Sequence, residues 1–169
     1  MRRAFLAAGA ILAGGVLMLS LAWGLQHAAL ASPQLLGRTA PSLAIQPPQG
    51  DPVSIAKLQG KPVVLNFWAS WCGPCLQELP VLASGQQTHP GVDFVGADMQ
   101  DTDSAAAQFE SMHPHPYPAG PIVSGSYQDY GVFGPPVTVF IASDGIVTAS
   151  FSGPLDQTTL DHYLALIGA

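Results

Sequence analysis

The chain has 169 residues, of which 48% are hydrophobic and only 9% are charged. This length suits a single domain, and a charged fraction so far below the usual ~25% argues against a disordered or coiled-coil protein. From Ser32 onward, three basic residues stand against eleven acidic ones, a formal charge of −8. Nucleic-acid binding needs clustered basic side chains to neutralise phosphates, so the composition excludes a nucleic-acid partner.

The N-terminal segment predicts export. Arg2 and Arg3 precede an uncharged run over residues 4–25, which would span about 33 Å as a helix, enough to cross a bilayer. The two arginines predict that the N-terminus stays in the cytoplasm and the rest of the chain lies outside it. A cleaved signal peptide is the alternative, with Ala-Leu-Ala at residues 29–31 as the cleavage site. We therefore expect residues 1–31 to be a membrane anchor or a signal peptide.

After a linker at residues 32–37, residues 38–169 are expected to form one domain. The predicted elements begin with a hairpin at 43–45 and 52–54, a strand at 62–68, a helix at 73–84 and a strand at 92–97. A helix at 103–112, capped by Asp101 or Asp103, and a proline-rich loop at 113–118 follow. The last elements are strands at 137–141 and 146–151, joined by a turn at 143–145, and a helix that is capped by Asp156 or Thr158 and ends near 167–168. Strands that alternate with helices predict an α/β fold with a mixed sheet covered on both faces.

The only cysteines, Cys72 and Cys75, are spaced C-x-x-C. A zinc site would lack two ligands, and a purely structural disulfide would close too short a loop to restrict the unfolded chain much. The pair instead follows a buried strand and begins a helix, with Pro74 suited to the first turn. Free backbone N–H groups and the helix dipole favour a thiolate there, so Cys72 is the expected nucleophile and Cys75 the resolving thiol.

Residues 66–75, Asn-Phe-Trp-Ala-Ser-Trp-Cys-Gly-Pro-Cys, resemble the active-site stretch of the thioredoxin superfamily. Leu-Gly-Arg-Thr-Ala-Pro at 36–41, Glu-Leu-Pro at 78–80 and Tyr-Gly-Val-Phe-Gly-Pro-Pro-Val-Thr at 130–138 resemble the exported TlpA/ResA/DsbE-like (CcmG) disulfide reductases. The resemblance covers residues 36–167. It implies a thioredoxin-like α/β fold, with a mixed central sheet, helices on both faces and an N-terminal β-hairpin extension.

The resemblance also implies a substrate-binding surface around the cysteines. Pro136 would be the cis-proline that faces them, and the residue before it would pair its backbone with a substrate strand. That residue is Pro135, which has no N–H to donate. Whether the bond before Pro135 or the bond before Pro136 is cis stays open, and an ordinary rigid turn is the alternative. Trp71, with Gly73 and Pro74 between the cysteines, completes the expected surface.

Glu78 is the candidate proton acceptor for Cys75. Thioredoxins carry a buried Asp on the strand before the motif, whereas this chain has Asn66, whose amide cannot accept a proton from the thiol. Glu78 lies three residues after Cys75 on the same helix face, and the resemblance places an acidic residue near the sulfurs there. Partial burial would raise its pKa and let it exchange a proton with Cys75. The alternative is a glutamate that faces solvent.

Three other side chains have a structural interpretation. Trp68 is expected in the core, because aromatic residues dominate core burial. His113 and His115 are close together but lie in a proline loop without a third ligand, so we expect solvated loop residues. We expect no metal, and no cofactor other than the redox-active Cys72–Cys75 disulfide.

These features predict a protein disulfide reductase in the bacterial periplasm, held by its anchor in the inner membrane or soluble if cleaved. The resemblance implies substrates such as apocytochrome c or a copper-site assembly protein of a respiratory oxidase. It also implies a transmembrane thiol reductase as electron donor.

Two alternatives remain. One is a disulfide oxidase on the same fold, because the motif does not set the reduction potential. The other is a copper-binding assembly chaperone, which the C-x-x-C spacing disfavours, since such proteins carry C-x-x-x-C and a downstream His. A peroxidase is disfavoured because Ala69 replaces the Thr of a T-x-x-C site.

Overall fold

The computed structural model describes residues 35–169. Its elements in chain order are β1 (Ala44–Ile45), β2 (Val53–Ser54), the 3-10 helix η1 (Ile55–Leu58), β3 (Val63–Trp68), α2 (Gly73–Thr88), β4 (Asp93–Asp98), α3 (Asp103–Met112), β5 (Ala119–Ser124), the 3-10 helix η2 (Tyr127–Tyr130), β6 (Val137–Ile141), β7 (Val147–Ser152) and α4 (Gln157–Leu166). The anchor or signal peptide predicted at 1–31 lies outside the described residues. None of the helices described after residue 34 combines the length and apolar character that crossing a bilayer needs.

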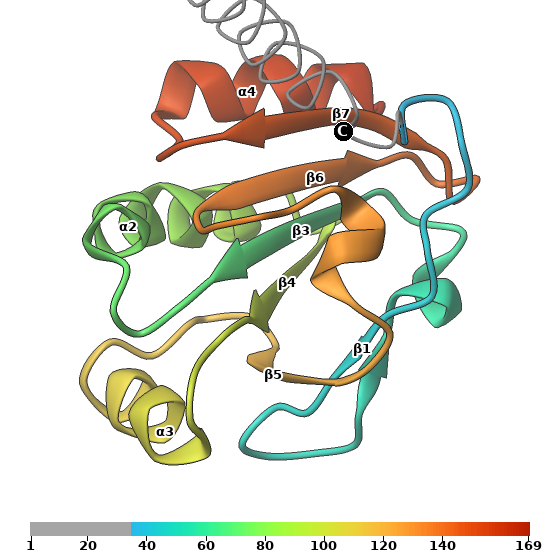
Figure 1. The fold of residues 1–169 in the computed structure, drawn as a ribbon. Helices are drawn as coiled ribbons and strands as arrows, with labels where there is room; N and C mark the ends of the chain where they lie inside the picture. Colours follow the sequence, from blue (N-terminus) through green and yellow to red (C-terminus); the bar gives the residue numbers. More distant parts are fainter. Residues whose placement is uncertain (1–34) are drawn as a thin grey trace, which may run out of the picture. The chain divides into compact units, whose positions relative to one another are not determined.

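The strands form one mixed sheet in the order β2-β1-β5-β4-β3-β6-β7 (Figure 1). β3 lies inside the sheet, parallel to β4 and antiparallel to β6, and β4 is also parallel to β5. β1 pairs antiparallel with both β2 and β5, so the N-terminal hairpin extends one edge of the sheet. The predicted mixed central sheet and its hairpin extension are confirmed.

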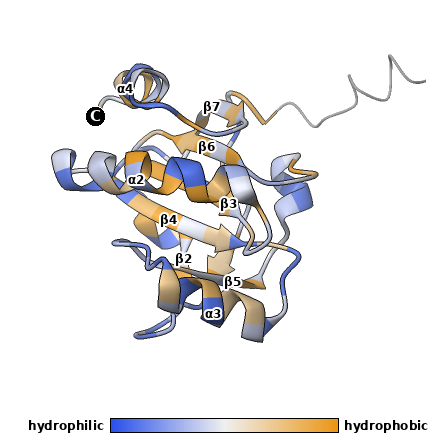
Figure 2. Ribbon diagram, turned by 90° about the vertical axis from the view of Figure 1, so that its left-hand side faces the viewer, coloured by the Kyte–Doolittle hydropathy of each residue, from blue (hydrophilic) through white to orange (hydrophobic). Residues whose placement is uncertain are grey.

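β3 is buried along its whole length because both faces of the sheet are covered. Leu65 and Phe67 point into a core that residues of η1 and η2 help to close, while Val64 faces residues of α2 and α4. On the same side as Val64, Trp68 packs against Phe109 of α3, with ring centroids 4.9 Å apart. Figure 2 shows the central strands mostly in hydrophobic colours. This buried strand fixes the position of the loop that follows it, which carries the cysteines.

β5 is the one strand that the sequence analysis did not predict. It follows the proline-rich loop directly and includes Gly120 and Pro121, both unfavourable in strand interiors. Tertiary pairing nevertheless makes it a strand, since Gly120 pairs with Ala97 and the carbonyl of Pro121 accepts the N–H of Gln46 at 3.0 Å. The crossover from β4 through α3 to β5 brings the segment between them beside the cysteine loop.

The helix boundaries differ from the prediction in two places. α2 continues to Thr88 rather than residue 84. α3 is capped by Thr102, whose side chain accepts the N–H of Ala105, so the predicted caps Asp101 and Asp103 are wrong. Asp103 is instead the first residue of the helix.

Each end of the domain is held by local contacts. Asp156 caps α4 as predicted, and its carboxylate accepts the N–H of Thr159 at 2.7 Å. At the other end, Leu35 packs against the core and the N–H of Gly37 donates to the carbonyl of Val147 at 2.8 Å. Residues 35–37, which the sequence assigned to the linker, therefore contact the domain.

Candidate active site

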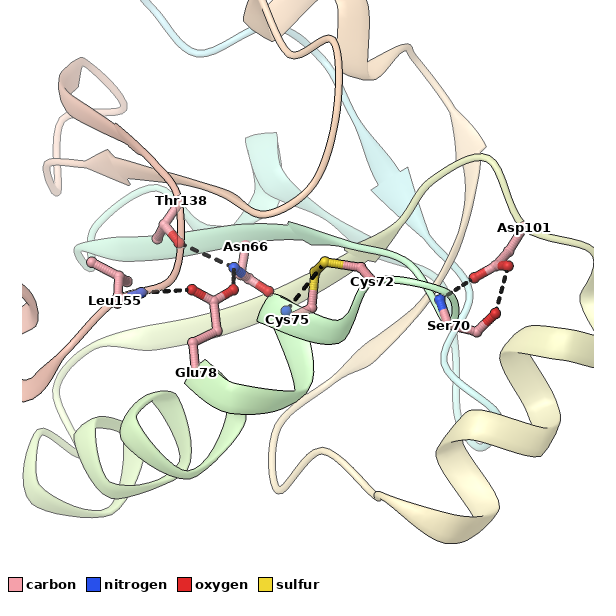
Figure 3. Close-up of a disulfide and its surroundings, with 8 residues drawn as sticks. All are labelled: Asn66, Ser70, Cys72, Cys75, Glu78, Asp101, Thr138 and Leu155. Atoms are coloured by element: carbon pink, nitrogen blue, oxygen red, sulfur yellow. Dashed lines mark hydrogen bonds between the residues drawn. A yellow bond between two sulfur atoms is a disulfide. The ribbon is translucent and has the colours of Figure 1, made fainter.

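A disulfide joins Cys72 and Cys75 where β3 passes into α2 (Figure 3). Cys72 is the N-cap of α2, and its sulfur accepts the N–H of Cys75 at 3.1 Å, while Pro74 occupies the first turn. Both cysteines are buried, with 4% of Cys72 and 5% of Cys75 exposed. The Cys72 sulfur thus lies where the unpaired N–H groups of a helix point, which favours a negative charge on that atom.

Glu78 lies one turn deeper in α2 and is only 1% exposed, so the solvent-facing alternative is wrong. Its Oε1 accepts the side-chain N–H of Asn66 at 2.8 Å, and its Oε2 accepts the backbone N–H of Leu155 at 2.9 Å (Figure 3). Asn66 also donates to the hydroxyl of Thr138 at 3.0 Å. Asn66 of β3 and the backbone between β7 and α4 therefore hold this carboxyl group in place, and Thr138 of β6 orients Asn66.

Burial raises the pKa of Glu78 to about 7, although the hydrogen bonds from Leu155 and Asn66 act in the opposite direction. A carboxyl group that titrates near neutral pH can both take up and release a proton under ordinary conditions. Glu78 is three residues after Cys75 in α2, so the two side chains lie on the same face of the helix. The carboxyl group is therefore placed to serve Cys75, the expected resolving cysteine.

A second carboxylate holds the loop on the other side of the disulfide. Asp101 accepts the backbone N–H of Ser70 at 2.5 Å and its hydroxyl at 2.7 Å (Figure 3). Trp71, which is 58% exposed, donates its indole N–H to the carbonyl of Gln100 at 3.4 Å. The sequence analysis treated Asp101 only as a helix cap, because its real partner is 31 residues away in the chain.

The bond between Pro135 and Pro136 is cis, which answers the question that the sequence left open. Pro136 directly precedes β6, in which Val137 pairs with Phe67 of β3, so Pro136 lies next to the end of β3 and the cysteine loop. Phe133, two residues before Pro135, is 72% exposed. The sequence analysis did not single out Phe133, although a bulky aromatic in a glycine-rich loop could have indicated a contact surface.

His115 differs from the expectation of a solvated loop residue. Its side chain is 4% exposed, its Nδ1 hydrogen-bonds to the carboxylate of Glu110, and its ring lies 4.7 Å from that of Trp68. The expectation was wrong because the proline loop folds back over an aromatic cluster rather than into solvent. Trp68 itself is 1% exposed, which confirms its place in the core. Among the described residues, no group of three or more His, Cys, Asp or Glu side chains could hold a metal ion.

Comparisons with known proteins point in the same direction as the geometry. The ResA thiol-disulfide oxidoreductase of Bacillus subtilis is 28% identical over 172 residues, covering 98% of this chain and 94% of its own length. The ResA protein of Bacillus thuringiensis strain Al Hakam is 30% identical over 138 residues, 78% of each chain.

Solved structures extend the likeness to the fold. A Chlorobium tepidum protein provisionally assigned as the thiol:disulfide interchange protein DsbE matches with a TM-score of 0.72 and 29% identity, over 79% of this chain and 98% of its own. A secreted Mycobacterium tuberculosis disulfide oxidoreductase, homologous to DsbE of E. coli, matches with a TM-score of 0.62 and 28% identity, over 72% and 93% of the two chains.

The fold and the closed C-x-x-C disulfide define a thioredoxin-like redox enzyme, a thiol–disulfide oxidoreductase. The chain belongs to the Redoxin family, whose family model matches residues 35–167. The thioredoxin-like fold and the likeness to ResA and DsbE proteins that the sequence predicted are confirmed.

Proposed function

We propose that this protein reduces disulfides in exported proteins, with its domain in the periplasm, during cytochrome c maturation or the assembly of a respiratory oxidase. The observation that carries the proposal is the buried Glu78 carboxyl group, with its pKa raised to about 7, in the same helix as a C-x-x-C disulfide. The thiol-disulfide oxidoreductase relatives support exchange with protein disulfides, and the secreted Mycobacterium tuberculosis homologue supports the compartment. The uncharged run after Arg2 and Arg3 supports attachment to the inner membrane.

In the first step, the Cys72 thiolate attacks one sulfur of the substrate disulfide. The substrate S–S bond breaks, a Cys72–substrate disulfide forms, and the released substrate thiolate takes up a proton. In the second step, Cys75 loses its proton to Glu78 and its thiolate attacks the Cys72 sulfur. The second substrate thiolate then leaves and is protonated, so the substrate gains two electrons and two protons.

The dithiol supplies the electrons, and no further cofactor enters this mechanism. Oxidation of the two thiols leaves the Cys72–Cys75 disulfide that the structure contains. A transmembrane thiol reductase would restore the dithiol by the same exchange in reverse. The proton on Glu78 returns to Cys75 in that half of the cycle.

The substrate would lie along the surface formed by Trp71, Gly73, Pro74 and the Pro135–Pro136 pair. Because Pro135 has no N–H, it offers a substrate strand a carbonyl acceptor but no donor. The exposed ring of Trp71 supplies apolar contact next to Cys72. Substrate binding on this surface therefore depends more on side-chain contacts than it does in a thioredoxin-like site whose residue at this position donates an N–H.

The reduction potential of the Cys72–Cys75 couple tests the proposal. The purified protein is equilibrated with glutathione or dithiothreitol buffers, and the fraction of dithiol is measured. We expect a potential below about −220 mV, close to that of thioredoxin, as a dedicated reductant requires. A value near about −120 mV would make the protein an oxidase and contradict the proposal. The Cys75→Ser variant cannot form the disulfide, so it gives the background signal for the measured dithiol fraction.

A further inference from the structure

A cavity of about 330 Å³ lies beside the active-site loop, between the end of β4 and the start of η2. Three aspartates line it: Asp98, Asp101 and Asp103. Gln100, also in the lining, has a φ of 60°, a left-handed conformation that is uncommon outside glycine. Its side chain donates to the hydroxyl of Tyr127 at 3.0 Å, which ties η2 to the cavity wall.

The cavity wall is connected to the reactive Cys72 through Asp101 and Ser70. Asp101 binds both the N–H and the hydroxyl of Ser70, and Ser70 is two residues before Cys72. Two residues of extended chain span at most about 7 Å. In Figure 3, Asp101 and Glu78 lie on opposite sides of the disulfide, so the cavity is separate from the buried Glu78 group.

Asp98 is the unusual member of the three aspartates. It is the last residue of β4, only 6% exposed, and its Oδ1 has no hydrogen-bond partner. Burial, and then the hydrogen bond and negative charge of Asp101, raise the pKa of Asp98 to about 8, with smaller effects from Glu110 and Asp103. A carboxyl group in this state is protonated at neutral pH because no cation compensates its charge.

The described chain supplies no such cation at this end of the sheet. Its only Lys and Arg side chains are Arg38, Lys57 and Lys61. Lys57 and Lys61 precede β3, and Lys61 pairs with Asp93 at the first residue of β4, at 3.7 Å. The carbonyl of Arg38 accepts the N–H of Val147, just after the β6–β7 turn. All three therefore lie at the end of the sheet opposite to Cys72.

We propose that the cavity lined by Asp98, Asp101 and Asp103 binds an arginine or lysine side chain that flanks the disulfide of a protein substrate. The inference rests on the proposed function, since it names the class of substrate for the same cysteines. The buried, unpartnered Oδ1 of Asp98 and the exposed carboxylate of Asp103 fit a cation that carries N–H donors. The short link from Asp101 to Cys72 places the basic residue within about three positions of the substrate cysteine.

Disulfide-bonded peptides that differ at one position test this selectivity. The reduced full-length protein is mixed with peptides carrying Arg, Gln or Glu about three residues before the cysteine, and the second-order rate constants are measured. We expect the Arg peptide to react about fivefold faster than the Gln peptide, and the Glu peptide to react more slowly than either. Salt raised from about 20 mM to about 300 mM should reduce the preference.

Two variants assign the preference to the cavity. Asp103→Asn removes one carboxylate from an exposed position in the first turn of α3, so the fold is expected to survive. We expect its Arg-to-Gln rate ratio to fall toward one. Asp144→Asn, in the β6–β7 turn, removes the same charge at the opposite end of the sheet and should keep the wild-type ratio.

The outcomes separate this inference from the proposed function. Equal rates for the Arg and Gln peptides would overturn the inference while the reductase function stands. A ratio that falls equally in Asp103→Asn and Asp144→Asn would also overturn it, because general charge would then cause the preference. If neither peptide is reduced, the proposed function fails and the inference falls with it.

Discussion

Glu78 combines the two properties that a proton acceptor for Cys75 needs: a fixed position and a pKa of about 7. Its fixed position comes from hydrogen bonds with Asn66 and with the N–H of Leu155. A glutamine there would keep the shape of the side chain but could not accept the proton.

We therefore predict that Glu78→Gln slows reduction of a peptide disulfide near pH 7 at least about tenfold. The same change should lower the pKa of Cys75, because the ionised Glu78 carboxylate opposes formation of the thiolate and glutamine carries no charge. Alkylation rates of Cys75 across the pH range, in a Cys72→Ala background, measure that titration. Asp161→Asn, an exposed carboxylate on α4, is the matched control. A Cys75 titration that Glu78→Gln leaves unchanged would contradict the proton-transfer role.

The sequence shows only the local part of this site. The spacing from Cys75 to Glu78 is a helical spacing, so the sequence alone indicates that the two share a face. Burial of Glu78 instead depends on the N–H of Leu155, which is 77 residues further along the chain. The same holds for Asp101 and Ser70, whose contact depends on how β3 and β4 lie side by side. Local patterns could not identify these partners.

The position of β5 beside β1 depends on the absence of a side chain at one residue. A Cβ atom at Gly120 would overlap the carbonyl oxygen of Gln46, which belongs to the segment that follows β1. Backbone cannot move aside as a flexible side chain can. The close approach of β1 to β5 therefore requires glycine at residue 120.

We predict that Gly120→Ala lowers the free energy of unfolding by about 1–3 kcal/mol, the usual cost of forcing extra volume into a packed region. Urea denaturation of the oxidised protein measures it. Gly91→Ala is the control, because a Cβ there would meet nothing within 4 Å. Equal stability of the two alanine variants would show that β1 can shift away from β5 at little cost.

β5 also shows where sequence patterns stop being informative about elements. β3 was predicted because a continuous apolar run is typical of a buried strand, and β6 because a hairpin turn signal at 143–145 follows it. β5 has Gly120 and Pro121 as its second and third residues, and it is a strand because it pairs with β1 on one side and β4 on the other. Asp101, which local patterns suggest as a cap of α3, likewise has a distant partner, Ser70, and Thr102 caps the helix instead.

Two buried carboxyl groups, Glu78 and Asp98, make the stability of the fold depend on pH. The pKa of Glu78 is raised from 4.5 to about 7, and that of Asp98 from 3.8 to about 8. Between about pH 4 and pH 8 the folded protein therefore binds more protons than the unfolded chain, and stability falls as pH rises. The stabilisation is fully present below the unfolded pKa values and is lost as pH passes through the folded ones.

We predict that the oxidised protein is more stable at about pH 5 than at about pH 8, by on the order of a few kcal/mol. Urea unfolding at a series of pH values measures the profile. Glu78→Gln and Asp98→Asn should each flatten it, because neither amide titrates. Stability that stays level or increases from about pH 5 to about pH 8 would show that these two carboxyl groups are ionised at little cost in the fold.

Shielding of the two sulfurs has a consequence for kinetics. With 4% of Cys72 and 5% of Cys75 exposed, dissolved small thiols and oxidants meet very little sulfur surface. Exchange depends on access as well as on thiolate character, so a protein that docks against Trp71 and brings its own sulfur into line has the advantage. We therefore expect the Cys72–Cys75 disulfide to exchange slowly with small thiols, which still reach equilibrium with it given time, and faster with a protein that docks against Trp71.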